Sequence, residues 1–109
     1  DLAARAINKK GVKNVVITLG KKGSVAYDGK RFIVSPAFPA VVKNTAGAGD
    51  AFNGALASEL ARGCSLANAL IYATAFSSLA VETANASDMP DNQAVLHRIK
   101  TTQYRQIIS

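Results

Sequence analysis

Short apolar runs alternate with longer segments of helical spacing along this chain, an order that predicts an α/β fold. Residues 15–19 are a mostly β-branched run of the kind that forms a strand buried on both faces. Residues 24–27 and 31–34 flank Asp28-Gly29, which is a strong signal for a β-hairpin. A further strand is expected at 40–42, after a connection that is bracketed by prolines.

Four segments place apolar residues at the spacing of a helix face. The third of them is apolar nearly all round and is therefore expected to be buried. Ser65 and Asp91 precede the last two segments and are suitable N-caps. The C-terminal tail stays open between two interpretations, because Ile107 and Ile108 either dock on the fold or fray. The four helical segments include residues 2–7, 48–62, 66–80 and 95–99.

The most informative stretch is Asn44-Thr45-Ala46-Gly47-Ala48-Gly49-Asp50, because it places a carboxylate beside unhindered backbone amides at the start of a helix. A helix start offers N–H groups without intrahelical partners and the positive end of the peptide dipoles. Glycines let this backbone approach an anion closely, so the turn is a natural phosphate site. The carboxylate of Asp50 is then either a helix cap or a catalytic group.

Residues 44–57 resemble the C-terminal signature of the ribokinase-like (PfkB) carbohydrate kinases. The signature has a small polar residue, Thr, any residue, Gly-Ala-Gly-Asp, three residues, and then Gly-Ala-Leu-Ala. Residues 15–23 and the alanine-rich segment 69–81 add to the similarity, which extends over 1–90. The resemblance implies a Rossmann-like layered α/β fold, in which helices pack on a mainly parallel sheet with a β-hairpin. Residues 1–109 would be the nucleotide-binding and catalytic C-terminal portion of such a kinase, without its N-terminal substrate half and lid.

For function, the resemblance implies transfer of the γ-phosphoryl group of ATP, with Mg²⁺, to a hydroxyl group of a small carbohydrate. Asp50 would be the base that accepts the hydroxyl proton, and Gly47, Ala48 and Gly49 would form the anion hole with it. Phosphoryl transfer depends mainly on positioning and on charge stabilisation, which suits such a site. A nucleoside or sugar-phosphate kinase of the same family and a non-catalytic nucleotide-binding module are the alternatives, and the fragment alone is expected to be inactive.

The strand-end loop after residue 17 lies where this family contacts the nucleotide. Two glycines three residues apart let the chain pass close to a phosphate or ribose, and either lysine between them could reach a phosphate. A solvated basic turn is the equal alternative for the lysines. A buried threonine of the third helix lies where relatives carry a polar group near the adenine, or else bonds its own helix backbone. The expected nucleotide-binding residues are Thr18, Leu19, Gly20, Lys21, Lys22, Gly23, Gly49 and Thr74.

Many members of the family bind a monovalent cation beside the anion hole, mainly through backbone carbonyls, so K⁺ is a further hypothesis. Two residues depart from the usual pattern. Asn44 stands where many members have Asp, and Asn85 stands where Gly is common. Asn can adopt the left-handed conformation that Gly would supply. The ligands implied by the resemblance are Asn44, Ala46, Ala80, Thr83 and Asn85.

Composition narrows the class of protein. Among 109 residues, 49% are hydrophobic and 18% are charged, a globular balance that argues against disorder. The net charge of +6 comes from dispersed lysines and arginines, which favours phosphate ligands over nucleic acid. A single cysteine, Cys64, favours a reducing, cytoplasmic setting, and no apolar run is long enough for a membrane span. Apolar surface left by a missing half makes a homo-oligomer a further expectation.

Overall fold

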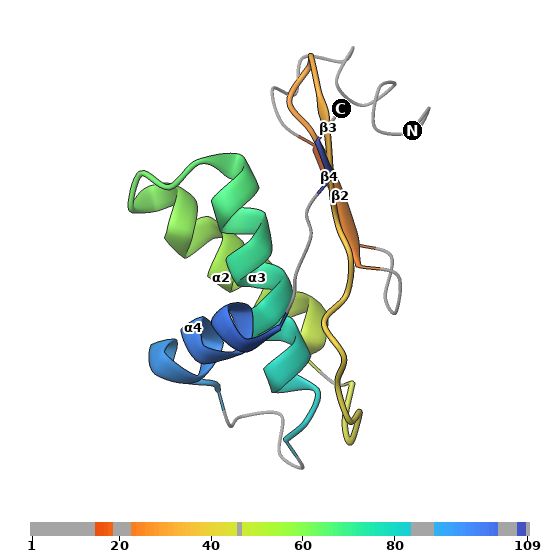
Figure 1. The fold of residues 1–109 in the computed structure, drawn as a ribbon, viewed down its shortest axis with the longest axis vertical. Coiled ribbons are helices and arrows are strands. Elements are labelled where there is room, and N and C mark those ends of the chain that lie inside the picture. Colours follow the sequence, from red (N-terminus) through yellow and green to blue (C-terminus); the bar gives the residue numbers. More distant parts are fainter. Residues whose placement is uncertain (1–14, 19–22, 46, 84–88, 103–106, 109) are drawn as a thin grey trace.

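The computed structural model describes residues 15–18, 23–45, 47–83, 89–102 and 107–108. Their elements, in chain order, are β1 (Val15–Thr18), β2 (Ser24–Tyr27), β3 (Phe32–Ser35), α2 (Ala48–Ala61), α3 (Leu66–Ala80), α4 (Asn92–Thr101) and β4 (Ile107–Ile108). In Figure 1 the three helices lie on one side of the sheet, so the described part of the chain is a helix layer packed on a sheet layer. The helix expected at 2–7 lies outside the described residues.

The strands form one sheet in the order β1-β2-β3-β4. The α/β class is as expected, but the mainly parallel sheet is not, since all three described pairings are antiparallel. The physical reason is the length of the connections: β1 to β2 and β2 to β3 are joined by a few residues, whereas a parallel pair needs a crossover of about a dozen or more. The tail docks as β4, with Ile108 opposite Ile33.

The turn between β2 and β3 confirms the expected hairpin. The Asp28 Oδ1 atom accepts hydrogen bonds from the amides of Lys30 at 2.9 Å and Arg31 at 2.8 Å. Gly29 has a φ of 93°, a conformation that favours glycine. The amides of Arg31 and Lys30 hold the pKa of the Asp28 carboxyl below its usual value, although slight burial opposes them. The turn is therefore stabilised by a carboxylate that caps its two backbone donors.

Both predicted N-caps are confirmed. The Ser65 hydroxyl accepts a hydrogen bond from the Asn68 amide at 3.2 Å at the start of α3, and the Asp91 carboxylate accepts one from the Ala94 amide at 2.8 Å at the start of α4. The α3 helix is largely buried, as its apolar composition predicts. Within the described residues, no helix combines the length and the hydrophobicity that a bilayer span requires.

Two apolar clusters share α3 as their common wall. The first lies between the sheet and helices α2 and α3, and the second lies between α3, α4 and the segment that follows β3. Burial of apolar surface stabilises the fold by about 25 cal/mol per Å². Because both clusters pack on α3, this helix is the central element of the core. The buried members are Ala26, Ile33, Phe52, Ala55, Leu70 and Ala73 in the first cluster, and Phe38, Ala75 and Val95 in the second.

The strand expected at 40–42 is wrong. These residues carry no sheet pairing, and the backbone of residues 41–44 instead bonds the residues that follow α3. The amide of Val41 donates to the Glu82 carboxylate at 3.0 Å. The amides of Lys43 and Asn44 both donate to the carbonyl oxygen of Val81, at 2.7 and 3.1 Å. The β-branched pair at 41–42 suggested a strand, but the side chain of Glu82, distant in sequence, takes the backbone donor.

Candidate functional site

A pocket of about 660 Å³ lies between the start of β2, the segment after β3, the N-terminal end of α2 and the C-terminal half of α3. Its volume suits a ligand the size of a nucleotide or a drug-like molecule. The wall is mostly apolar, with a few hydroxyl groups from α3. The lining residues are Gly23, Ser24, Ala37, Phe38, Ala40, Val42, Thr45, Ala48, Gly49, Phe52, Thr74, Ser77, Ser78 and Val81.

The pocket brings together three features that are far apart in the sequence. Gly23 comes from the predicted nucleotide loop, Ala48 and Gly49 from the predicted anion hole, and Thr74 from α3. Asp50 is the next residue after Gly49 but is exposed and does not line the pocket. For Thr18 the structure describes only its place at the end of β1. The predicted residues Leu19, Gly20, Lys21 and Lys22 lie outside the described residues.

The first turn of α2 shows which backbone amides already have a hydrogen-bond acceptor. Gly47 is the N-cap, with a φ of 78°, and supplies no side-chain cap. The Ala48 amide donates to the carbonyl oxygen of Thr45 at 3.2 Å, so this predicted member of the anion hole is already engaged. Within the described residues, the amides of Gly49 and Asp50 have no acceptor. These two donors sit at the positive end of the helix dipole.

The alternative role of Asp50 as a side-chain N-cap is wrong. The cap position belongs to Gly47, and Asp50 lies in the first turn of the helix. Among the described residues, its carboxylate has no hydrogen-bond donor or cationic partner. A carboxylate in a first turn still gains from the helix dipole. Its exposure leaves its oxygens free to meet a ligand that reaches the edge of the pocket.

Gly49 has a backbone that other residues could adopt, so the fold itself does not require glycine there. Its φ is not positive, and a Cβ built on it meets no atom within 4 Å. Gly23 is the opposite case, with a φ of 100° and with Ser35, Pro36 and Ala37 backbone atoms against the place of its Cβ. Glycine at 23 is therefore a requirement of the fold, whereas glycine at 49 keeps open space beside the pocket.

Thr74 lies in the pocket wall and bonds its own helix, which confirms the helix-backbone interpretation, while its contact with a nucleotide stays a prediction. Its hydroxyl donates to the carbonyl oxygen of Leu70 at 2.6 Å. The Ser24 hydroxyl oxygen lies 3.3 Å from the Thr74 hydroxyl oxygen. Since the proton of Thr74 is committed to the backbone, its oxygen is available only as an acceptor. It is buried, with 6% of its surface exposed.

Several pocket residues were not found from the sequence. Phe38, Val42 and Val81 form apolar wall, and Ser77 and Ser78 add hydroxyl groups one turn after Thr74. Phe38 is in the proline-bracketed connection, which reads as a linker until the fold places it against α3. The serines had a weak signal, since they are polar positions in a helix that is otherwise apolar.

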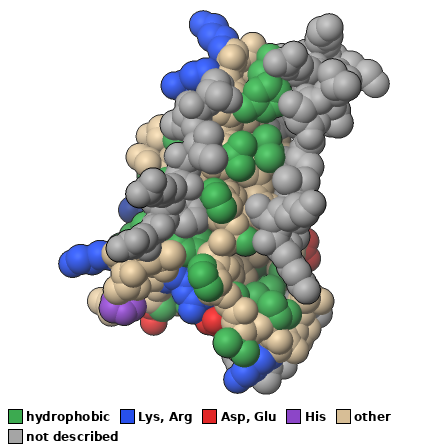
Figure 2. Space-filling view, turned by 45° about the vertical axis from the view of Figure 1, so that its right-hand side comes forward, with side chains coloured by type: hydrophobic (Ala, Val, Ile, Leu, Met, Phe, Trp, Pro, Cys, Tyr) green, Lys and Arg blue, Asp and Glu red, His purple; other side chains and the backbone are tan. Residues whose placement is uncertain are grey.

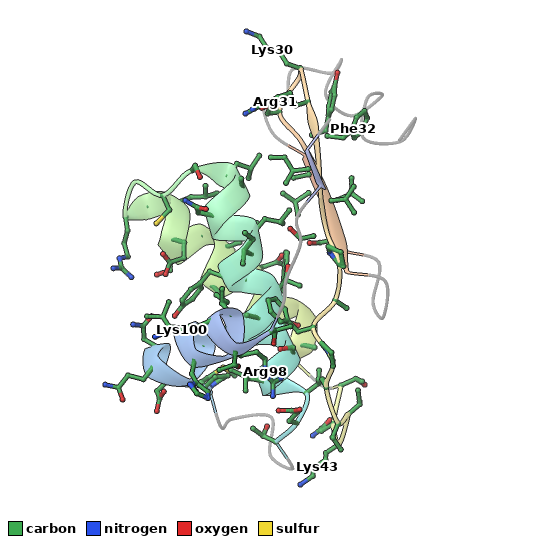
Figure 3. All side chains as sticks on the ribbon, in the orientation of Figure 1. Lys30, Arg31, Phe32, Lys43, Arg98 and Lys100 are labelled. Atoms are coloured by element: carbon green, nitrogen blue, oxygen red, sulfur yellow. The ribbon has the colours of Figure 1, made fainter. Side chains whose placement is uncertain are left out.

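A charged network ties the pocket wall to α4. Arg98 Nη2 donates to Glu82 Oε1 at 2.7 Å, and Arg98 Nη1 donates to the Ser78 hydroxyl at 3.1 Å. Figure 3 shows Arg98 where α4 lies beside the end of α3. Burial would raise the pKa of the Glu82 carboxyl, but the Val41 amide and the Arg98 guanidinium together lower it. Glu82 is therefore held as a carboxylate that joins α4 to the segment leading into α2.

The predicted cation ligands are partly placed by the structure. The Asn44 amide donates to the Val81 carbonyl, which brings residue 44 beside the end of α3. The Ala80 carbonyl oxygen accepts from the Thr83 hydroxyl at 2.9 Å and from the Thr83 amide at 3.3 Å. Ala46 and Asn85 lie outside the described residues. Three of the five candidates therefore come from neighbouring segments, although the Ala80 oxygen is already bonded.

Cys64 has the environment of a structural thiol. Its Sγ donates to Glu59 Oε2 at 3.2 Å. This hydrogen bond, together with burial and the charge of Glu59, raises the pKa of the Cys64 thiol. A thiol that is kept protonated is a poor nucleophile. His97 is exposed on α4 and does not line the pocket, as expected of a surface histidine.

The sequence of the chain matches a known family. Residues 1–93 match the family model described as pfkB family carbohydrate kinase. The chain belongs to this family. It is 35% identical over 101 residues to the ribokinase of Lactococcus lactis, with 92% of this chain and 34% of that protein covered. The chain spans about a third or less of the length of the curated relatives that it matches first.

Solved structures agree on the fold. The structure of Arabidopsis thaliana ribokinase complexed with ribose and ATP is 38% identical, has a TM-score of 0.86, and is matched over 93% of this chain and 33% of that one. Phosphofructokinase-2 from Escherichia coli in complex with potassium is 27% identical, with a TM-score of 0.82 over 91% of this chain and 32% of that one. The described residues therefore form part of a ribokinase-type α/β fold.

Proposed function

We propose that residues 1–109 are the nucleotide-binding and catalytic C-terminal portion of a longer PfkB-family kinase. The whole protein would transfer the γ-phosphoryl group of ATP to a hydroxyl group of a small carbohydrate. The observation that carries this proposal is the pocket that joins Gly23, Gly49 and Thr74 beside the first turn of α2. A phosphate-accepting helix start at the mouth of a mostly apolar pocket suits the two ends of a nucleotide, its phosphates and its base.

The residues at the helix start fit a phosphate group. The amides of Gly49 and Asp50 are donors without a described acceptor, at the positive end of a helix of 14 residues. The space beside Gly49 would be filled by a Cβ in any other residue. Donors fixed in place before reaction stabilise charge that develops in a transition state. We assign this role to these amides, with that of Gly47 beside them.

Asp50 is the proposed base that accepts the proton of the sugar hydroxyl. Its exposed carboxylate, one residue after the pocket-lining Gly49, has no described partner that would occupy it. A loose phosphoryl-transfer transition state asks little of the base, so a carboxylate is sufficient. ATP would supply the phosphoryl group, with Mg²⁺ bridging phosphate oxygens and largely keeping its waters. Among the described residues, no three acidic, His or Cys side chains gather as a metal site.

Exposed apolar side chains support a covering partner for this portion. Val42, in the pocket wall, is 52% exposed, and its neighbour Val41 is 69% exposed. Figure 2 shows hydrophobic side chains spread down the face that the sheet and this segment present. The N-terminal part of the kinase, with the sugar site, would cover them, and a homo-oligomer is the other occupant. Without that N-terminal part, residues 1–109 alone would have no kinase activity.

Comparison of two glycines tests the phosphate site. Neither Gly49 nor Gly54 has an atom within 4 Å of its Cβ position, and both lie in α2. Alanine at either position should stabilise the helix by up to about 1 kcal/mol. We expect Gly49→Ala to weaken ATP binding or turnover by about 10-fold or more, because its Cβ enters the phosphate space. Gly54→Ala is the matched control, and equal activity of the two variants in the intact protein would contradict the proposal.

A non-catalytic nucleotide-binding module is the second candidate, since the base is beside the pocket and not in its wall. Nucleoside and sugar-phosphate kinases remain alternatives within the family. The K⁺ hypothesis has its own test, in which turnover is compared in potassium, sodium and a large organic cation. We expect potassium to give the highest rate, because carbonyls near residues 44 and 80 would bind it. Equal rates in the three salts would rule the cation site out.

A further inference from the structure

The segment that leads into the phosphate-binding turn is held at three backbone amides by the end of α3. Val41 donates to the Glu82 carboxylate at 3.0 Å, and Lys43 and Asn44 donate to the Val81 carbonyl oxygen at 2.7 and 3.1 Å. Gly47, the N-cap of α2, follows only three residues after Asn44. The place of the helix start is therefore coupled to the residues that follow α3.

Of these three bonds, one depends on a side chain and can be removed without changing the backbone. Glu82 uses both carboxylate oxygens, one for the Val41 amide and one for Arg98 Nη2 at 2.7 Å. Arg98 also donates to Ser78, whose hydroxyl in turn donates to the Ala75 carbonyl oxygen at 2.6 Å. The ion pair is fairly shielded, with 21% of the Arg98 side chain and 25% of the Glu82 side chain exposed.

The network touches two walls of the pocket at once. Ser78 and Val81 line it from α3, and Val42 lines it from the segment that Glu82 holds. A shielded ion pair that is also bonded to Ser78 and to the Val41 amide holds a fixed geometry, whereas most exposed ion pairs contribute little to stability. Figure 3 shows Lys43 at the far end of this segment, directed away from the molecule, so the backbone and not this side chain makes the contact.

We propose that Glu82 and Arg98 are positioning residues of the kinase site: they fix the Val41–Asn44 segment and, through it, the phosphate-binding turn at Gly47–Asp50. Neither residue touches the ligand in this account. Their effect is exerted by the Val41 backbone, which needs an acceptor at the place of Glu82 Oε2. The proposal rests on the proposed function for its consequence in catalysis, but not for its structural part.

The structural part is tested by hydrogen exchange on the intact protein. We expect Glu82→Ala to speed exchange of the amides of Val41, Lys43 and Asn44 by about 10-fold, because an anchored segment then opens more readily. Arg62→Ala is the matched control. Arg62 pairs with Glu59 at 3.3 Å at the other end of α2, away from the pocket, and its side chain is more exposed than that of Arg98. Equal exchange in the two variants would overturn the proposal.

The catalytic part is tested by kinetics at a temperature where every variant is folded. We expect Glu82→Ala to lower kcat by about 10- to 100-fold, as for a misplaced catalytic constellation, with a smaller effect on the KM for ATP. Glu82→Gln keeps an oxygen for the Val41 amide and should retain more activity. The charge swap Glu82→Arg with Arg98→Glu restores an ion pair but presents a donor to Val41, so we expect no recovery. Full recovery by the swap, or unchanged kcat in Glu82→Ala, would overturn the positioning role.

The two proposals can fail separately. If the wild type phosphorylates no substrate, the proposed function fails, and the positioning role is then decided by amide exchange and by ATP affinity. It is overturned in that case if Glu82→Ala matches Arg62→Ala in both measurements. If the wild type is an active kinase and Glu82→Ala matches it, only the positioning role is overturned.

Discussion

The Gly23→Ala substitution should be among the most destabilising single changes in this chain. Gly23 has a φ of 100°, and its Cβ position is 2.7 Å from the Ala37 amide nitrogen and 2.8 Å from the Pro36 carbonyl carbon, with the Ser35 carbonyl oxygen closer still. All three neighbours are backbone atoms, so no side chain can rotate away. The strands must shift apart, at the point where Ser24 pairs with Ser35.

The magnitude has two parts. A left-handed backbone costs a residue with a Cβ about 1–2 kcal/mol. Forcing an extra carbon into closely packed surroundings costs about 1–3 kcal/mol. The sum of about 2–5 kcal/mol is a large share of the 5–15 kcal/mol by which domains are typically stable. Because Gly23 also lines the pocket, ATP affinity should fall with stability.

Gly63→Ala separates the two parts. Gly63 has a similar φ of 90°, but nothing lies within 4 Å of its Cβ position. It should therefore lose only the conformational part, about 1–2 kcal/mol. Urea denaturation of the intact protein, with the free energy of unfolding extrapolated to water, measures both variants. A Gly23→Ala loss no larger than that of Gly63→Ala would refute the reasoning from the backbone contacts.

Three further predictions concern ionisable side chains. The pKa of the Glu82 carboxyl is lowered in the fold, so its contribution to stability is present above its ordinary pKa of about 4.3 and is lost as the pH falls through the lower folded pKa. Glu82→Gln should therefore flatten the acid side of a curve of unfolding free energy against pH, and an unchanged curve would contradict the network. The pKa of the Cys64 thiol is raised by its hydrogen bond to Glu59, so its alkylation near neutral pH should be slower than that of a free thiol and should speed up in Glu59→Gln. The alkylation rate is followed by mass spectrometry, and a wild-type rate equal to that of a free thiol would contradict this prediction. Asp28→Ala removes the acceptor of two turn amides and should cost about 1 kcal/mol in urea denaturation, whereas Asp28→Asn should stay close to wild type; equal losses would contradict the role of the turn.

Local signals in the sequence predicted the parts of the fold that are made locally. Ser65 and Asp91 cap helices with hydrogen bonds to amides three residues ahead, and Asp28-Gly29 forms its turn with the next two amides. The strand expected at 40–42 failed because the acceptor of the Val41 amide is Glu82, 41 positions away. No residue near Val41 carries a sign of that bond.

The candidate site also contains residues that a local sequence pattern indicates and residues that only the packing of distant segments brings to the pocket. Gly49 could be placed at the pocket because a glycine-rich turn before a helix has a local pattern with a physical meaning, whereas the role of Asp50 stays a prediction. Phe38 and Ser78 could not be assigned, since their place in the pocket depends on how α3 packs against the segment after β3. The Glu82–Arg98 pair joins the turn after α3 to α4, 16 positions apart in the sequence, and a charge pattern alone does not show such pairing.

The central claim is that Asp50 acts as the base of a sugar kinase. The most direct measurement is an ATP-to-ADP assay of the intact protein, wild type and Asp50→Asn, across a panel of sugars, nucleosides and sugar phosphates. We predict that one substrate stimulates wild-type turnover and that Asp50→Asn loses it while still binding ATP. Turnover that survives Asp50→Asn nearly intact, or ATP binding by the wild type without turnover on any substrate, would contradict the account.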